Sequence, residues 1–186
     1  NKCKLETVSY GHGITTTPLQ AASAYATITN GGYLIKPTLI RKKNIDHYSQ
    51  NNKIISSETS EKINIILRKV VTDQNGTASL ADIFGYDVGG KTGTSQKYNQ
   101  KNKNINTFIS TFPSKKPQYI LLVMIDDPKP APHILYNYRG SKVKVNRNEA
   151  GWNSVYVAGK IIEKIGPILA INNEEVYSKY VVKKPY

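Results

Sequence analysis

The chain has 186 residues, of which 39% are hydrophobic and 13 are glycine, a composition that suits one globular domain and excludes an intrinsically disordered chain. Its net charge is +13, but the basic residues are scattered and no aromatic-interleaved basic motif marks a nucleic-acid interface. Cys3 is the only cysteine, which excludes an internal disulfide and a cysteine-based metal site. The longest apolar run, residues 119–125, is too short to span a bilayer.

The first helix is predicted from its capping residues. Thr17-Pro18-Leu19-Gln20 combines a threonine N-cap, a proline at the first helical position and a glutamine that completes a capping box. The helix is expected to end at Asn30-Gly31-Gly32, because glycine adopts the left-handed conformation that follows many helices. Residues 33–35 and 38–40 are expected to be short strands that Pro37 separates.

A second helix is predicted after Ser56. Its apolar residues form a single stripe at helical spacing: Ile63, Ile66, Leu67 and Val70. Residues 83–94 then form a glycine-rich extended stretch. Residues 97–104 have no apolar periodicity and are expected to be an exposed loop.

A β-hairpin and a third helix are predicted in the second half of the chain. Residues 105–112 and 119–125 have strand-like sequences joined by a proline-containing turn. The second strand is apolar throughout, so we expect it in the interior of a sheet. Residues 128–150 contain several prolines and are expected to be irregular. The last helix should cover about residues 153–165 and end at Gly166-Pro167.

Two functions compete for the glycine-rich segment around Lys91. Residues 85–92 match the phosphate-binding pattern G-x-x-x-x-G-K-[ST], and the apolar strand before Asp126 resembles the one whose acid holds magnesium in such enzymes. A nucleotide hydrolase, however, needs a helix directly after the lysine, because the phosphates bind at the N-terminus of that helix. The polar residues 97–104 do not predict one, so we keep this function only as the less favoured alternative.

The motifs that accompany Lys91 favour a different function. The chain contains, in this order, GHGITTTPLQ at residues 11–20, Gly76-Thr77-Ala78, Gly90-Lys91-Thr92-Gly93-Thr94 and Ile125-Asp126-Asp127-Pro128. Over residues 8 to about 170, these motifs resemble the rear half of a penicillin-binding transpeptidase domain, most closely that of the class B enzymes of cell division. The resemblance implies an α+β fold, with an antiparallel β-sheet sandwiched between helices. It also implies the activity of a peptidoglycan D,D-transpeptidase.

The resemblance further implies roles for the residues of the Lys-Thr-Gly strand. In this family a serine attacks the carbonyl of a D-Ala-D-Ala peptide or a β-lactam beside that strand. Lys91 would supply positive charge to the catalytic site, Thr92 and Thr94 would bind the terminal carboxylate, and the Thr94 N–H would form half of the oxyanion hole. Gly93 would let the substrate lie against the strand without a clash. No cofactor is implied, and no metal site is predicted from the three histidines, His12, His47 and His133.

The serine that this chemistry requires is not identified in the chain. The family uses a Ser-x-x-Lys and a Ser-x-Asn motif, both upstream of the TPLQ helix. Residues 141–144 and 49–51 fit these two patterns, but both lie downstream of that helix, and we reject them. Residues 1–171 are therefore expected to be the C-terminal part of the domain, followed by a polar tail at 172–186. We expect this part alone to be inactive, and the alternative is a non-catalytic remnant or a cell-wall binding module.

The resemblance also implies ligands, partners and a location. Peptidoglycan stem peptides and β-lactams would bind the site, and other cell-division or cell-wall synthesis proteins would be partners. The chain opens with Asn1 rather than methionine, so we expect it to be the back part of a longer protein. The membrane anchor that the resemblance implies would then lie upstream of it. The intact enzyme would then act on the outer, periplasmic side of the cytoplasmic membrane.

Overall fold

The computed structural model describes residues 4–9, 11, 13–40, 52–97, 100 and 103–171. Its helices are α1 (Lys4–Ser9), α2 (Pro18–Thr29), α3 (Ser57–Thr72) and α4 (Ser154–Ile171), with short 3-10 turns η2 (Ser79–Ala81) and η3 (Ala150–Trp152). Its strands are β1 (Gly89–Gln96), β2 (Asn104–Phe112), β3 (Tyr119–Asp126), β4 (Tyr136–Tyr138) and β5 (Ser141–Val143).

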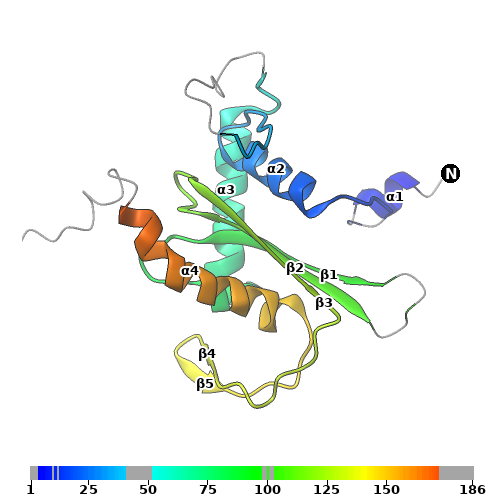
Figure 1. Cartoon of the computed structure of the whole chain (residues 1–186), viewed down its shortest axis with the longest axis vertical. Helices are drawn as coiled ribbons and strands as arrows, with labels where there is room; N and C mark the ends of the chain where they lie inside the picture. The colour runs from blue at the N-terminus through cyan, green and yellow to red at the C-terminus, as the bar shows by residue number, and fades with distance from the viewer. Residues whose placement is uncertain are drawn as a thin grey trace, which may run out of the picture.

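An antiparallel sheet of order β1-β2-β3 lies at the centre of the described structure. In Figure 1, α4 crosses in front of this sheet and α3 runs behind it. The two hydrophobic faces of the sheet are thus each covered by helix, which is a stable layered arrangement. The predicted α+β fold, with an antiparallel sheet between helices, is confirmed.

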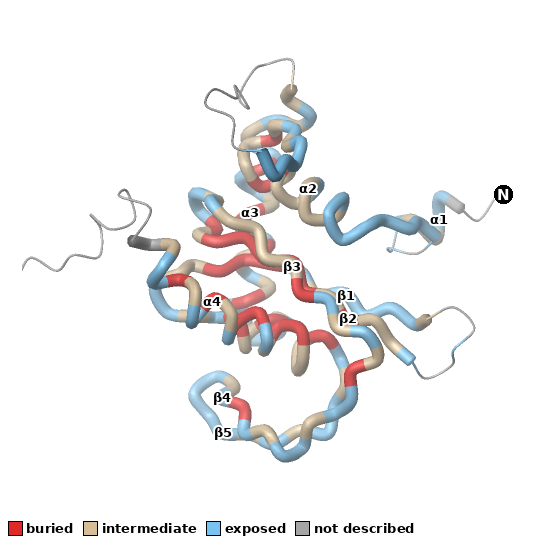
Figure 2. Tube along the Cα trace, in the orientation of Figure 1, coloured by how far each residue is buried: buried red, intermediate tan, exposed pale blue. Residues whose placement is uncertain are grey.

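The main core lies between the sheet and α4. Side chains alternate between the two faces of a strand, so Phe108 of β2 and its partner Val123 of β3 point to the same side. There they join Val155 and Ile162 of α4 in one buried cluster. Figure 2 shows the buried residues concentrated along β2 and along α4. Burial of each such side chain contributes roughly 1.5–3 kcal/mol, so this layer fixes the position of α4 on the sheet.

The opposite side of β1 is held by α3. A Cβ at Gly89 would lie 3.1 Å from the backbone nitrogen of Arg68, so glycine permits the close approach of strand and helix. The Arg68 side chain donates to the Val88 carbonyl at 2.7 Å and forms ion pairs with Asp82 at 2.9 Å and Asp87 at 3.0 Å. These contacts anchor the segment that leads into β1.

The predicted capping box at Thr17 and the predicted start of a helix after Ser56 are both confirmed. The Thr17 N–H donates to Gln20 Oε1 at 2.9 Å and the Gln20 N–H donates to Thr17 Oγ1 at 3.2 Å, which completes the capping box of α2. Helix α3 starts after Ser56, whose hydroxyl accepts from the Thr59 N–H at 3.1 Å. The end of α2 at Asn30 is also as predicted.

The short strands predicted at 33–35 and 38–40 are wrong. Only Tyr33 forms a β-bridge among these residues, an isolated one with Lys53. The Tyr33 N–H donates to the Asn30 side chain at 2.9 Å, and the Ile35 N–H donates to Thr27 Oγ1 at 3.1 Å. Side chains at the end of α2 thus occupy donors that a strand ladder would need.

The predicted end of the last helix is also wrong, because α4 continues through Gly166 and Pro167 to Ile171. Gly166 lies against the ring of Tyr86, where a Cβ would come within 2.3 Å. Beyond the proline, Leu169 packs against the core, and its carbonyl accepts from Tyr119 Oη at 3.4 Å. Pro167 by itself favours the end of a helix, but these tertiary contacts stabilise the last helical turn beyond it.

The predicted hairpin is confirmed as β2 and β3, which pair from Ile105 and Asp126 to Phe112 and Tyr119. The interior position expected for its second strand is not found. In the described part of the chain β3 is an edge strand, and Val123 is its single buried residue. The strand is apolar because helices α2 and α4 pack against it, not because it has a neighbouring strand on each side.

The segment predicted to be irregular contains the β4–β5 hairpin. Strands β4 and β5 pair antiparallel around Arg139 and Gly140, which both have positive φ, 52° and 79°. Two consecutive residues of this kind form the type I′ turn that suits the twist of a two-residue hairpin. The prolines at 128, 130 and 132 predict an irregular segment, but they all precede this short hairpin and do not prevent it.

Candidate active site

Lys91, Thr92, Gly93 and Thr94 lie in the middle of β1, which is an edge strand in the part of the sheet that the structure describes. An edge strand presents unpaired N–H and C=O groups that can pair with an added extended chain. Strand β1 continues to Gln96, so no helix N-terminus follows Lys91. The phosphate-binding interpretation of residues 85–92 is therefore wrong, since it requires that helix.

Alternation along β1 divides the predicted site residues between two faces. Thr92 and Thr94 lie on the α4 side, where Thr92 Oγ1 is 2.9 Å from Thr77 Oγ1 and Thr94 Oγ1 accepts from the Ala150 N–H at 3.3 Å. Lys91 lies on the α3 side, and its ammonium donates to the Thr92 carbonyl at 2.7 Å. The two threonines thus line one pocket, and the lysine approaches the strand from the opposite face.

Gly93 differs from the other glycines of β1 in its surroundings. A Cβ at Gly90 would lie 2.6 Å from the Ile109 carbonyl oxygen, whereas a Cβ at Gly93 would meet nothing nearer than 4.0 Å. The packing of the described residues therefore requires glycine at 90 but not at 93. Since packing does not explain the glycine at 93, its lack of a side chain favours the close approach of a ligand to this edge strand.

Thr92 and Thr94 open into a pocket of about 310 Å³. Its walls come from β1, the turn before η2, the end of β4 and the segment that leads into η3. The remaining lining residues are Gly76, Thr77, Tyr138, Arg147, Glu149, Ala150, Gly151 and Trp152. In the sequence, Gly76-Thr77 belongs to a recognisable motif, but no motif marks the wall that residues 147–152 form.

Asn106 fixes this wall to the sheet. It is fully buried and lies directly opposite Thr94 in the register of β1 and β2. Its side-chain amide donates to the Asn148 carbonyl at 2.6 Å and to Asn153 Oδ1 at 3.1 Å. No sequence signal marked Asn106, because its partners are 42 and 47 residues away along the chain.

Opposite charges and aromatic rings meet in the pocket wall. Arg147 Nε lies 3.1 Å from Glu149 Oε2, and Nη2 lies 3.0 Å from Oε1. The hydrogen bond from Arg147 lowers the pKa of Glu149, and the same bond raises the pKa of Arg147, so both are charged at neutral pH. Beside them, the rings of Tyr138 and Trp152 lie 5.0 Å apart at 35°.

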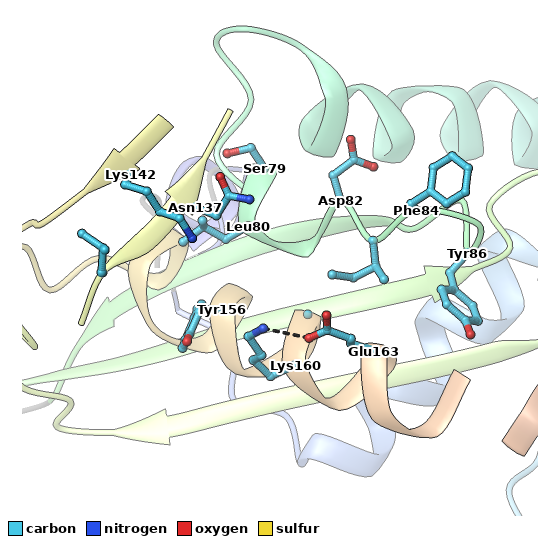
Figure 3. A pocket seen from close by; sticks show the side chains of 13 residues that line it. Ser79, Leu80, Asp82, Phe84, Tyr86, Asn137, Lys142, Tyr156, Lys160 and Glu163 are labelled. Atoms are coloured by element: carbon cyan, nitrogen blue, oxygen red, sulfur yellow. Dashed lines mark hydrogen bonds and ion pairs between the residues drawn. The ribbon is translucent and has the colours of Figure 1, made fainter. Parts of the chain in front are cut away.

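A larger cavity of about 490 Å³ lies between η2, the β4–β5 hairpin and α4. Figure 3 shows Asp82, Phe84 and Lys142 around it, with the ion pair of Lys160 and Glu163 along one side. No residue of β1 lines this cavity, so it is separate from the pocket beside the Lys-Thr-Gly strand.

The structure supports the rejection of one of the two motif lookalikes. Ser141 begins β5, and a strand does not bring a lysine three residues later onto the same face as a helical turn would. The other lookalike, residues 49–51, lies outside the described residues. Among the residues that the structure describes, no group of His, Cys, Asp and Glu could hold a metal ion, and no helix is long and apolar enough to cross a membrane.

Comparison with known proteins identifies the family. The model of the penicillin binding protein transpeptidase domain matches residues 1–148. A probable peptidoglycan D,D-transpeptidase FtsI of Caulobacter vibrioides is 31% identical over 177 residues, covering 89% of this chain and 28% of that protein. Stage V sporulation protein D of Bacillus subtilis is 35% identical over 136 residues, covering 66% of this chain and 21% of its own length.

Solved structures agree with this assignment. The transpeptidase domain of FtsI4 from Legionella pneumophila superposes with a TM-score of 0.56 at 27% identity, over 80% of this chain and 46% of that one. The corresponding domain of Burkholderia pseudomallei penicillin-binding protein 3 has the same fold, with a TM-score of 0.67 at 23% identity over 90% and 47%. The chain thus spans less than half of the solved domains and less than a third of these curated relatives. The chain belongs to the penicillin-binding protein transpeptidase family.

Proposed function

We propose that this chain is the rear part of a peptidoglycan D,D-transpeptidase that cross-links stem peptides through a serine acyl-enzyme. The observation that carries the proposal is the open edge of β1, where the hydroxyls of Thr92 and Thr94 line one pocket and Gly93 leaves the strand accessible. The extended D-Ala-D-Ala end of a stem peptide, or a β-lactam, would lie along this edge as an added strand.

Different residues of β1 would bind the substrate and stabilise the charge that develops during the reaction. Thr92 and Thr94 would bind the terminal carboxylate of the donor peptide with their hydroxyls. The Thr94 N–H would supply half of the oxyanion hole, which stabilises the negative charge that develops on the attacked carbonyl. Lys91 would supply positive charge to the catalytic site from the opposite face of the strand.

The nucleophilic serine and its lysine would come from residues that precede this chain. The pocket beside β1 is lined by no serine or cysteine of the described residues. The intact protein would act at the outer face of the cytoplasmic membrane, held there by an upstream anchor, and would meet other cell-division or cell-wall synthesis proteins.

The test is to treat the source cells with a fluorescent penicillin and to capture every protein that an antibody against this chain recognises. A labelled band well above 20.7 kDa, the mass of the chain, supports the proposal. An unlabelled band at 20.7 kDa would instead mean a non-catalytic remnant or a cell-wall binding module. A labelled band at that mass would place the nucleophile within this chain and overturn the assignment.

A further inference from the structure

The pocket beside β1 carries a charged pair that the fold does not need. Arg147 and Glu149 line the same pocket as Thr92 and Thr94, yet their side chains are 59% and 52% exposed. Exposed ion pairs add only about 0–1 kcal/mol to stability. The pair can therefore rearrange around a ligand without destabilising the domain.

The geometry of the pair leaves room for a ligand that carries both charges. Glu149 occupies the Nε and Nη2 side of the Arg147 guanidinium, which has five N–H donors arranged in a planar fork. The donors that remain can bind a second carboxylate. The Glu149 carboxylate, which has several lone pairs, can accept from an ammonium at the same time.

The neighbouring rings provide an apolar surface that leads to this pair. Tyr138 and Trp152 line the pocket with their rings 5.0 Å apart at 35°, and Tyr136 packs edge-on against Trp152 at 5.5 Å. Methylene groups pack well on such faces while a charged end group stays in water. The surface thus suits a short aliphatic stem with a charged head.

The wall is also held at a fixed position relative to β1. Asn106 binds the Asn148 carbonyl, and the Ala150 N–H binds Thr94 Oγ1, so contacts to the sheet lie on both sides of Glu149. Such support is what a binding site needs for selectivity, because misplacement by about 1 Å weakens recognition.

We propose that Arg147 and Glu149 form a subsite for the zwitterionic amino-acid head of a stem-peptide side chain, one carbon that carries both an ammonium and a carboxylate. Arg147 binds the carboxylate, Glu149 binds the ammonium, and the methylene stem lies on Tyr138 and Trp152. This inference rests on the proposed transpeptidase function. It identifies the preferred substrate as a stem peptide with a diamino-dicarboxylic acid rather than a simple diamino acid such as lysine.

The test compares two pentapeptides that end in D-Ala-D-Ala and differ only at the third residue, which is meso-diaminopimelate or L-lysine. The full-length gene product that contains this chain is mixed with each peptide, and the slowing of its labelling by a fluorescent benzylpenicillin is measured. The unmodified protein should bind the diaminopimelate peptide about tenfold more tightly, the effect of one charge-assisted contact.

Two variants separate the roles of the pair. Arg147→Gln should reduce the affinity for the diaminopimelate peptide to that for the lysine peptide, whose affinity should not change, because the carboxylate is the group that distinguishes them. Glu149→Gln should weaken both peptides about tenfold, because both carry the ammonium. The matched control is Lys160→Gln, which breaks an ion pair with Glu163 of similar exposure on α4 and should change neither affinity.

The outcomes distinguish this inference from the function on which it rests. The labelling rate of each variant without peptide is its own reference, and its melting temperature followed by circular dichroism shows that the domain is folded. Normal labelling with equal affinity for the two peptides, or with affinities that Arg147→Gln leaves unaltered, would overturn the subsite alone. Absence of labelling in the unmodified protein would overturn the transpeptidase function itself.

Discussion

Replacement of Asn106 by alanine should loosen the pocket wall and destabilise the domain. The side chain is fully buried and makes two hydrogen bonds, at 2.6 Å to the Asn148 carbonyl and at 3.1 Å to Asn153 Oδ1. Each bond contributes about 1 kcal/mol net, and a buried acceptor left with a poor partner costs about 1–3 kcal/mol more. After the change the Asn148 carbonyl keeps only a contact at 3.4 Å from Asn153. The buried Asn106 Oδ1 has no hydrogen-bond partner, so its removal offsets about 1 kcal/mol, and the expected loss is about 2–4 kcal/mol.

Urea unfolding of the chain, followed by circular dichroism and by tryptophan fluorescence, measures this loss. With a denaturant dependence of about 2 kcal/mol per molar urea, the midpoint should fall by about 1–2 M. Trp152 is the only tryptophan of the chain and lies next to Asn153, so its emission reports the wall directly. Its emission without urea should shift in the Asn106→Ala variant.

Asn64→Ala is the matched control, because Asn64 is also buried but binds the Thr29 carbonyl at 2.9 Å, between α3 and the end of α2. Because one hydrogen bond rather than two is lost, the free energy of unfolding should fall by only about 1–2 kcal/mol. The midpoint should then fall by about 0.5–1 M, and the tryptophan emission should not change. Equal midpoints for the two variants, with the same emission in both, would refute the role assigned to Asn106.

The remaining predictions address β1, a helix cap and the charged pair. In the full-length gene product, Gly93→Ala should fold normally but reduce penicillin labelling about tenfold or more, because the added methyl group blocks the ligand. Gly90→Ala should instead lower the melting temperature, because its Cβ has no space; equal melting temperatures would contradict this. Thr17→Ala should cost about 1 kcal/mol in urea unfolding through loss of the capping box. The lowered pKa of Glu149 means that its stabilising contribution is present above the unfolded pKa of about 4.3 and is lost as pH falls through the lower folded value. A pH titration of tryptophan emission should show this transition, and Arg147→Gln should move it to higher pH.

Local sequence determined the elements whose signals lie within a few residues. The capping box of Thr17 and Gln20 fixes the start of α2, because both partners lie in one helical turn. The order of the motifs, together with Lys91 to Thr94 on a strand, was enough to indicate the family before any contact was known. These features were predictable because the residues that produce them lie close to one another in the sequence.

Contacts between distant segments decided the rest. The end of α4 could not be predicted, because Gly166 and Pro167 indicate a stop that the packing of Tyr86 and Leu169 overrides. The pocket wall is likewise tertiary: Arg147 and Glu149 face Thr94 only because Asn106 holds the intervening loop from another strand. Composition and periodicity report which residues are buried, but they do not report which buried residues meet. The sequence by itself therefore determined the Lys-Thr-Gly strand, and the tertiary structure decided what lies opposite it.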